Sequence, residues 1–191
     1  MSSRNDLIRL LAERSVKTGN FTLSSGKQSS VYVDARLTTM SPDGLNLIGR
    51  LGIDTIAQSG WEADAIGGLT LGADPIAYAI SYASANLEKS LRAFTVRKQA
   101  KVHGTGNLIE GPFQSGDRVV IVEDVITTGS SALTAIDAVE AAGGVVVGLL
   151  ALVDREEGGR QTIEAKGHRV VAITRVGEII ELQQRQNTLD A

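Results

Sequence analysis

The stretch VVIVEDVITTGSS, residues 119–131, decides the fold of this chain. It begins as a run of β-branched residues, which favours a buried strand, and ends in a turn rich in glycine and hydroxyl groups. Apolar residues then recur at helical spacing and predict a helix over 132–142. The N-terminus of a helix after a buried strand offers backbone N–H groups to an anion. Because Glu123 and Asp124 suit sugar hydroxyls or a metal ion, a phosphorylated ribose is the first hypothesis.

The composition is that of a globular protein with no general affinity for polyanions. The chain has 191 residues, 42% of them hydrophobic, and a formal net charge of −3. This charge gives no overall attraction to nucleic acids or anionic membranes, so any anion site depends on local cations. The absence of cysteine excludes disulfides, thiolate metal sites and a cysteine nucleophile. The first residues do not resemble a signal peptide and no apolar run is long enough to span a membrane, so we expect a cytoplasmic protein.

The pattern of residues changes near residue 60. Before it, the predicted elements are a helix over 6–14, strands over 21–23 and 31–36 that form a hairpin, and a helix over 43–58. After it, the predicted strands cover 63–68, 91–96, 119–124, 145–154 and 170–173, with helices from Asp74 and over 131–142. Asp74 and Pro75 are expected at the N-cap and first turn of the former helix.

Alternation of strands and helices predicts an α/β fold with a doubly wound, mainly parallel central sheet flanked by helices. Such sheets bind ligands at the carboxyl ends of their strands. We expect a single domain over 1–191, with a core over about 61–155. The remaining parts, about 1–60 and 156–191, are expected to form a small cap, or hood, on the core.

Two loops at predicted strand ends have both a functional and a plain structural interpretation. The glycine-rich loop 67–75 can form a backbone site for phosphate or pyrophosphate, or it can be an ordinary turn between a strand and a helix. The loop 97–107 holds three cations and a histidine and lacks periodicity. It can be a lid that brings positive charge to a polyanion, or a solvated run of charges.

Two further loops carry charged residues. The turn at 127–131 fits neither a Walker A motif nor a dinucleotide-binding glycine motif. Glu123 and Asp124 before it can bind a ligand, or be a helix-capping carboxylate beside a solvated one. Arg155 can bind a planar carboxylate with its guanidinium group, or pair with Glu156 or Glu157 at the surface.

The loop sequences together resemble those of the type I phosphoribosyltransferases. Residues 120–131 are similar to the phosphoribosyl-pyrophosphate signature of that family, and the Arg-Lys-x-x-Lys-x-His-Gly-x-Gly pattern of residues 97–106 resembles orotate phosphoribosyltransferases. Residues 21–26, the Tyr-x-Asp-x-Arg pattern of residues 32–36, and Asp154-Arg155 are also similar to that family. The resemblance runs from about residue 21 to residue 159.

The resemblance implies roles for particular residues. The implied phosphoribosyl-pyrophosphate site consists of Arg97, Lys98, Lys101, His103, Glu123, Asp124, Val125, Ile126, Thr127, Thr128, Gly129, Ser130 and Ser131. Within it, the two acids hold the ribose hydroxyls, the turn holds the 5-phosphate, and the lid cations meet the pyrophosphate. Thr127 and Arg155 are implied to contact orotate, and Lys101, His103 and Asp124 are implied to be catalytic.

The resemblance also implies the reaction, its cofactor and the assembly. The reaction is transfer of the 5-phosphoribosyl group to orotate in pyrimidine biosynthesis, with Mg²⁺ carried mainly by substrate oxygens and no dedicated protein metal site. A homodimer with active sites shared across its interface is implied. This chain has Ser24 and Gly72 where some members carry Lys, so more of the positive charge would come from Arg97, Lys101 and Lys27.

Two alternatives stay open. A phosphoribosyltransferase acting on another nucleobase would share the fold, but a neutral base needs no cation for a carboxylate. A non-catalytic regulator that senses phosphoribosyl pyrophosphate would be expected to carry a DNA-binding domain or a basic face. The acidic net charge gives no sign of one.

Overall fold

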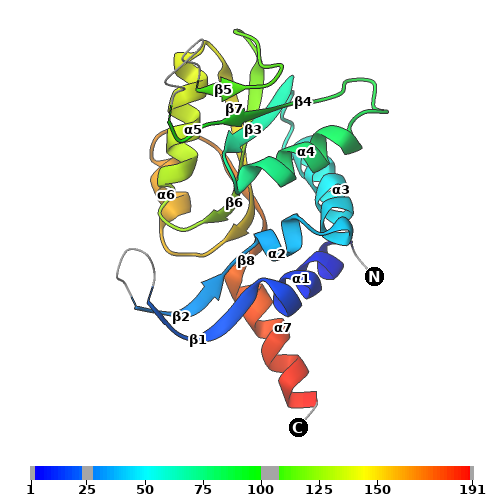
Figure 1. Ribbon diagram of the computed structural model, residues 1–191, viewed down its shortest axis with the longest axis vertical. Helices are drawn as coiled ribbons and strands as arrows, with labels where there is room; N and C mark the ends of the chain where they lie inside the picture. The colour runs from blue at the N-terminus through cyan, green and yellow to red at the C-terminus, as the bar shows by residue number, and fades with distance from the viewer. Residues whose placement is uncertain (1–2, 23–27, 100–107, 190–191) are drawn as a thin grey trace.

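The computed structural model describes residues 3–22, 28–99 and 108–189, and its centre is a six-stranded sheet (Figure 1). The strands lie in the order β5-β4-β3-β6-β7-β8. Their bounds are β3 (Ala65–Leu69), β4 (Arg92–Val96), β5 (Ile109–Glu110), β6 (Arg118–Ile126), β7 (Val145–Asp154) and β8 (Val170–Arg175). All neighbours are parallel except β5, which runs antiparallel to β4. The predicted mainly parallel α/β sheet is therefore confirmed.

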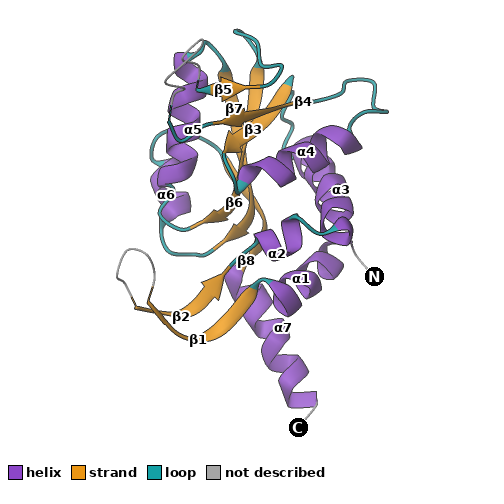
Figure 2. Ribbon diagram, in the orientation of Figure 1, coloured by secondary structure: helices purple, strands orange, loops and turns teal. Residues whose placement is uncertain are grey.

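Helices cover both faces of the sheet (Figure 2). The helices α3 (Pro42–Gln58) and α4 (Ala73–Ala83) contribute to one apolar cluster, and α5 (Ser130–Ala141) and α6 (Gly159–Glu164) contribute to the other. The central strands β6 and β7 are consequently buried on both sides, which explains why their sequences are continuous apolar runs rather than alternating ones.

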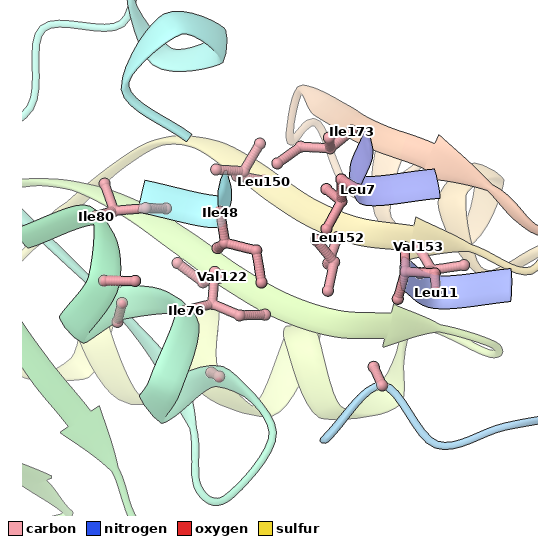
Figure 3. Close-up of a cluster of buried hydrophobic side chains, with 14 of the residues drawn as sticks. Leu7, Leu11, Ile48, Ile76, Ile80, Val122, Leu150, Leu152, Val153 and Ile173 are labelled. Atoms are coloured by element: carbon pink, nitrogen blue, oxygen red, sulfur yellow. The ribbon is translucent and has the colours of Figure 1, made fainter. Parts of the chain in front are cut away.

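The first cluster joins the sheet to the two ends of the described chain (Figure 3). Ile48 and Ile76 pack over Val122, while Leu7 and Leu11 belong to the same cluster as strand β7. Burial of each such side chain stabilises the fold by about 1.5–3 kcal/mol. The N-terminal end of the described chain therefore shares a core with the sheet.

We use the name cap for a narrower set of elements than the predicted ranges 1–60 and 156–191. These elements are α1 (Ser3–Arg14), the antiparallel hairpin of β1 (Val16–Thr22) and β2 (Gln28–Val33), the short helix α2 (Arg36–Thr39), and α7 (Val176–Leu189). Helices α1 and α7 are joined by a hydrogen-bonded ion pair between Arg4 and Glu178, with the nearest atoms 2.6 Å apart. The Gln183 side-chain amide donates to the carbonyl oxygens of Ala12 and Val16. Helix α7 ties the hairpin to α1, although the sequence predicted no helix there.

Two local predictions are corrected by the structure. The strand predicted over 31–36 ends at Val33, because the Asp34 carboxylate accepts the backbone N–H of Arg36 and starts α2. Asp74 is not an N-cap: the cap is Gly72, and Asp74 instead accepts hydrogen bonds from Thr70 and Thr95. The short elements β5 and α6 were not predicted.

Two broader expectations also meet the structure here. Strand β8 lies in the sheet although it follows residue 155, where the predicted core ended. The division of a single domain into core and cap stays a prediction. Among the described residues, no helix has the length and apolar character needed to cross a bilayer.

Candidate active site

The strand order reverses between β3 and β6. The chain leaves β3 toward β4 on one side, and it leaves β6 toward β7 on the other. Because the connections diverge, the loops after β3 and β6 leave a crevice between them at the carboxyl ends of the strands, where ligands of such sheets bind. A cavity of about 320 Å³ occupies this position. Its lining residues are Tyr32–Arg36, Leu69–Gly72, Lys98, Glu123–Val125, Thr127, Ser131 and Arg155.

A smaller hollow of about 70 Å³ adjoins the cavity at the N-terminus of α5 and is lined by the turn 126–131. Gly129 adopts φ +84°, and a β-carbon there would lie 2.9 Å from the carbonyl oxygen of Gly159. Only glycine fits this position without strain. The hydroxyls of Thr128 and Ser130 lie 3.1 Å apart. Hydroxyls and helix N–H groups around a small hollow can hold one phosphate group.

Near the end of β6, Glu123 lines both spaces and Asp124 lines the cavity. Glu123 is 9% exposed, and its Oε2 atom is buried without a hydrogen-bond partner. Burial, with the nearby charge of Asp124, raises the pKa of Glu123 to about 8. Burial also raises the pKa of Asp124, although the backbone N–H of Val125 donates to it at 2.8 Å. Such a carboxyl pair is prepared to exchange hydrogen bonds with ligand hydroxyls.

Arg155 approaches the cavity from the end of β7 and its side chain is only 7% exposed. Nη2 donates to the Ser29 hydroxyl and the Val31 carbonyl oxygen, both at 3.2 Å, and pairs with Glu157 at 2.7 Å. Nε is buried and has no partner. The predicted ion pair with Glu157 therefore exists, but it is not a surface pair, and a donor remains for a ligand carboxylate.

A second arginine borders the cavity, and sequence reasoning gave it no role. Arg36 forms two hydrogen bonds with the Asp34 carboxylate, from Nε at 2.8 Å and from Nη2 at 3.0 Å. Both residues stood in the Tyr-x-Asp-x-Arg pattern that carried part of the family resemblance. Their position at the end of the hairpin, next to the loops of the sheet, became visible only with the tertiary structure.

The predicted site residues fall into three groups. Most of them line the cavity or the hollow, and Ile126 does so although its side chain is 1% exposed and packs in the core. Arg97 does not line either space and pairs with Glu110 at 3.3 Å, whereas its neighbour Lys98 reaches the cavity. Lys101 and His103, together with the cap residues Ser24 and Lys27, lie outside the described residues.

Comparison with known proteins shows similarity over almost the whole chain. The family model described as phosphoribosyl transferase domain matches residues 41–175. The orotate phosphoribosyltransferase of Aquifex aeolicus (strain VF5) is 45% identical over 183 residues, which are 94% of this chain and 99% of that protein. That of Tropheryma whipplei (strain Twist) is 46% identical over 178 residues, 93% of this chain and 83% of that protein.

Solved structures show the same similarity. The orotate phosphoribosyltransferase of Mycobacterium tuberculosis H37Rv in complex with 5-phospho-alpha-D-ribosyl 1-diphosphate gives a TM-score of 0.78 at 40% identity, covering 93% of this chain and 99% of that one. The structure from Aeropyrum pernix gives a TM-score of 0.77 at 34% identity, with coverages of 92% and 96%. Coverage this complete includes the cap as well as the sheet.

Proposed function

Because this chain belongs to the orotate phosphoribosyltransferase family, we propose that it transfers the 5-phosphoribosyl group from phosphoribosyl pyrophosphate to orotate. The products would be orotidine 5′-monophosphate and pyrophosphate, in the synthesis of UMP. The observation that carries this proposal is the Arg155 side chain, buried beside the carboxyl pair with an unpartnered Nε. A neutral base would give that donor no carboxylate to bind.

The donor substrate fits the two adjoining spaces in one orientation. Its 5-phosphate would occupy the hollow at the N-terminus of α5, where Thr128 and Ser130 supply hydroxyls. Its ribose hydroxyls would then lie at Glu123 and Asp124, at the border between hollow and cavity. With a pKa of about 8, Glu123 carries a proton at neutral pH, so it can donate one hydrogen bond to a hydroxyl and accept another.

Orotate would occupy the larger cavity, with its carboxylate on Arg155 and a further contact from Thr127. Ser29 and Val31 hold the guanidinium group in place, so the hairpin of the cap orients the residue that selects the base. A guanidinium group that is already oriented loses little entropy when a carboxylate binds it. This arrangement supports orotate as the acceptor over uracil or a purine.

The reaction forms a bond from a ring nitrogen of orotate to the anomeric carbon and breaks the bond from that carbon to pyrophosphate, and the proton of the nitrogen is released to solvent. Positive charge develops on the ribose, and negative charge develops on the leaving group. Asp124 would stabilise the former and Lys98 the latter. Holding both substrates in one cavity supplies proximity, and no protein nucleophile is needed. Lys101 and His103 are proposed to act with Lys98 on the pyrophosphate.

The acidic end of β6 fits Mg²⁺ bound with the substrate. The Asp124 carboxylate offers oxygens of the type that Mg²⁺ prefers, whereas the protonated Glu123 would be a donor to the ribose rather than a metal ligand. Among the described residues, no group of three or more acids, histidines or cysteines could hold a metal ion. We propose that substrate oxygens provide most of the ligands, as the family resemblance implies. When bound, Mg²⁺ would neutralise charge on the pyrophosphate.

A homodimer with shared active sites is part of the same proposal. The groove between α3 and α4 supports it, because its lining is mainly apolar and includes the exposed aromatic side chains of Tyr78 and Tyr82. Mixing Lys101→Ala protein with Asp124→Asn protein should restore activity if each site takes residues from both subunits. Sedimentation would give the oligomeric state. A cytoplasmic location stays a prediction.

A spectrophotometric assay tests the reaction directly. The protein is mixed with phosphoribosyl pyrophosphate, Mg²⁺ and orotate, and the loss of orotate absorbance is followed. Parallel reactions contain adenine, hypoxanthine or uracil. We expect turnover of orotate alone. Turnover of a neutral base without turnover of orotate would contradict the assignment, and binding of phosphoribosyl pyrophosphate without any turnover would favour a regulator.

A further inference from the structure

Arg36 borders the cavity in a fixed orientation. The Asp34 carboxylate accepts hydrogen bonds from Nε and Nη2 of the guanidinium group and from the backbone N–H of Arg36, at 2.8, 3.0 and 3.2 Å. Three bonds to one carboxylate fix both the side chain and the start of α2. Nη1 has no hydrogen-bond partner among the described residues, and the side chain is 51% exposed. A guanidinium group held on one edge presents its other donors to a ligand.

The positive charge of Arg36 can attract an anionic group of a ligand in the cavity. The described cations that line the cavity are Arg36, Lys98 and Arg155. Arg155 is already bound to Glu157 and the hairpin, while Lys98 is an exposed residue at the end of β4, with a long flexible side chain. Arg36 has a fixed direction and an open donor, as Arg155 does, but its side chain is 51% exposed instead of 7% and is not needed for orotate. Burial raises the pKa of Asp124, and the charge of Arg36 is one of the smaller effects that oppose this rise.

In the loop 70–72, which also lines the cavity, position 72 has no side chain. A β-carbon at Gly72 would lie 2.5 Å from the Asp124 carboxylate, so position 72 leaves that part of the cavity open. The backbone of 70–72 lines the cavity there, and Thr70 anchors it by donating its N–H to Val96 and its hydroxyl to Asp74. Asp124 thus has the glycine loop on one side and is within the electrostatic reach of Arg36.

We propose that Arg36 binds the pyrophosphate group of the donor substrate and of the product, and that Asp34 positions it for this role. The inference rests on the proposed function, since pyrophosphate is the leaving group of that reaction. The diphosphate carries the largest negative charge in the reaction, and its charge grows as the bond to the anomeric carbon breaks. A fixed guanidinium group at this end stabilises the leaving group without reorganising.

Binding of inorganic pyrophosphate, measured by calorimetry in the presence of Mg²⁺, tests the role of Arg36 without requiring turnover. Arg36→Gln should weaken pyrophosphate binding by about tenfold or more, the effect of losing one charged hydrogen bond. Arg36→Lys should recover part of the affinity. Asp34→Asn should give an intermediate loss, because it leaves the guanidinium group present but less firmly oriented.

Arg14→Gln is the matched control. Arg14 and Asp43 form a similar two-point pair, at 2.8 and 2.7 Å, outside the cavity. This variant should bind pyrophosphate as the wild type does. In the reverse reaction, Arg36→Gln should raise the KM for pyrophosphate while the KM for orotidine 5′-monophosphate stays within twofold. Thermal melting of each variant shows whether it is folded. If Arg36→Gln does not fold, the binding of pyrophosphate is compared between Arg36→Lys and the wild type instead.

Three results would overturn the inference: wild-type affinity in Arg36→Gln, an equal loss in Arg14→Gln, or a loss confined to orotate and its nucleotide. The last would make Arg36 a base-binding residue. Failure of the proposed function is a separate outcome. In that case the wild type would bind pyrophosphate and lose affinity in Arg36→Gln, yet show no turnover of orotate.

Discussion

Arg155 Nη2 lies 2.7 Å from Glu157 Oε1, at the end of an arginine side chain that is 93% buried by the hairpin and the sheet loops. We expect Arg155→Gln to raise the KM for orotate at least tenfold, because a hydrogen bond to a charged group contributes about 1.5–3 kcal/mol. The KM for phosphoribosyl pyrophosphate should change little. Steady-state kinetics with each substrate varied in turn would measure both.

Arg160→Gln is a suitable control for that substitution. Arg160 pairs with Glu164 one helical turn away, in an exposed position outside the cavity. Its loss should leave both KM values unchanged, since exposed pairs of this kind contribute only a few tenths of a kcal/mol. An unchanged KM for orotate in Arg155→Gln would remove the reason for assigning orotate to the larger cavity.

The buried carboxyl of Glu123 should make stability depend on pH. Its pKa rises from the usual 4.5 to about 8 in the folded protein, so between these values the folded state holds a proton that the unfolded state has released. The contribution of Glu123 to the free energy of unfolding therefore falls as pH rises through this window and is constant above it. Glu123→Gln removes the ionisation, so its stability relative to the wild type should increase by a few kcal/mol between pH 5 and pH 9.

Urea unfolding at both pH values would measure this difference. Glu140→Gln, at an exposed position on α5, is the control and should follow the wild type. If the relative stability of Glu123→Gln were the same at pH 5 and pH 9, Glu123 would be ionised in the folded protein. Its proposed role as a donor to a ribose hydroxyl would then be wrong.

Gly72 should be sensitive to a single methyl group. In Gly72→Ala the new β-carbon would displace the Asp124 carboxylate, which lies 2.5 Å from that position. We expect a higher KM for phosphoribosyl pyrophosphate and a lower kcat, with only a small change in melting temperature, because Asp124 can rotate into the cavity. Kinetics and thermal melting of the same preparation would separate the two effects.

Gly167→Ala is a control that should lower stability without changing the kinetics. Its added β-carbon meets no atom, but Gly167 has φ +92°, which is strained for alanine. This variant should lose about 1 kcal/mol of stability and keep wild-type kinetics. Should Gly72→Ala bind phosphoribosyl pyrophosphate normally, the position of Asp124 would not matter for the donor substrate.

Asp74 is expected to position the loop at 70–72. Its carboxylate accepts hydrogen bonds from Thr70 at 2.7 Å and from Thr95 at 2.8 Å, and the Tyr78 hydroxyl lies 2.8 Å from that of Thr95. Asp74→Ala should cost about 1–3 kcal/mol and raise the KM for phosphoribosyl pyrophosphate. Tyr78→Phe removes only the hydrogen bond between Tyr78 and Thr95. It should cause a smaller loss of stability and a smaller rise in the KM for phosphoribosyl pyrophosphate than Asp74→Ala does. Equal kinetic effects of the two changes would contradict the role of Asp74.

The elements predicted best from the sequence are those whose surroundings are uniform. Strand β7 begins and ends where predicted, at Val145 and Asp154, because helices cover both faces of the sheet and the strand is buried from Gly148 onward. The loop after β6 was recognisable for a related reason. Acids and a glycine turn directly after such a strand have few structural explanations, and the structure places them at the crevice between β3 and β6.

The features that could not be predicted from the sequence depend on contacts with residues far away along the chain. Asp74 looked like a helix cap until Thr70 and Thr95 were found to occupy its carboxylate. Helix α7 has a weak apolar pattern of its own, and its burial comes from contact with α1. Arg97 and Lys98 were equivalent in the sequence, but the pairing of Arg97 with Glu110 on β5 turns it away from the cavity.

The contact between α1 and α7 has a consequence for the order in which the protein can fold during synthesis. Arg4 and Glu178 are 174 residues apart along the chain, and the ribosome makes α1 first. Leu7 and Leu11 must therefore remain without their final packing until almost the whole described chain has emerged. Until then the apolar face of α1, which includes Leu7 and Leu11, lacks the cover that α7 provides. Silent changes that slow translation near α7 would prolong that exposure without altering the finished enzyme.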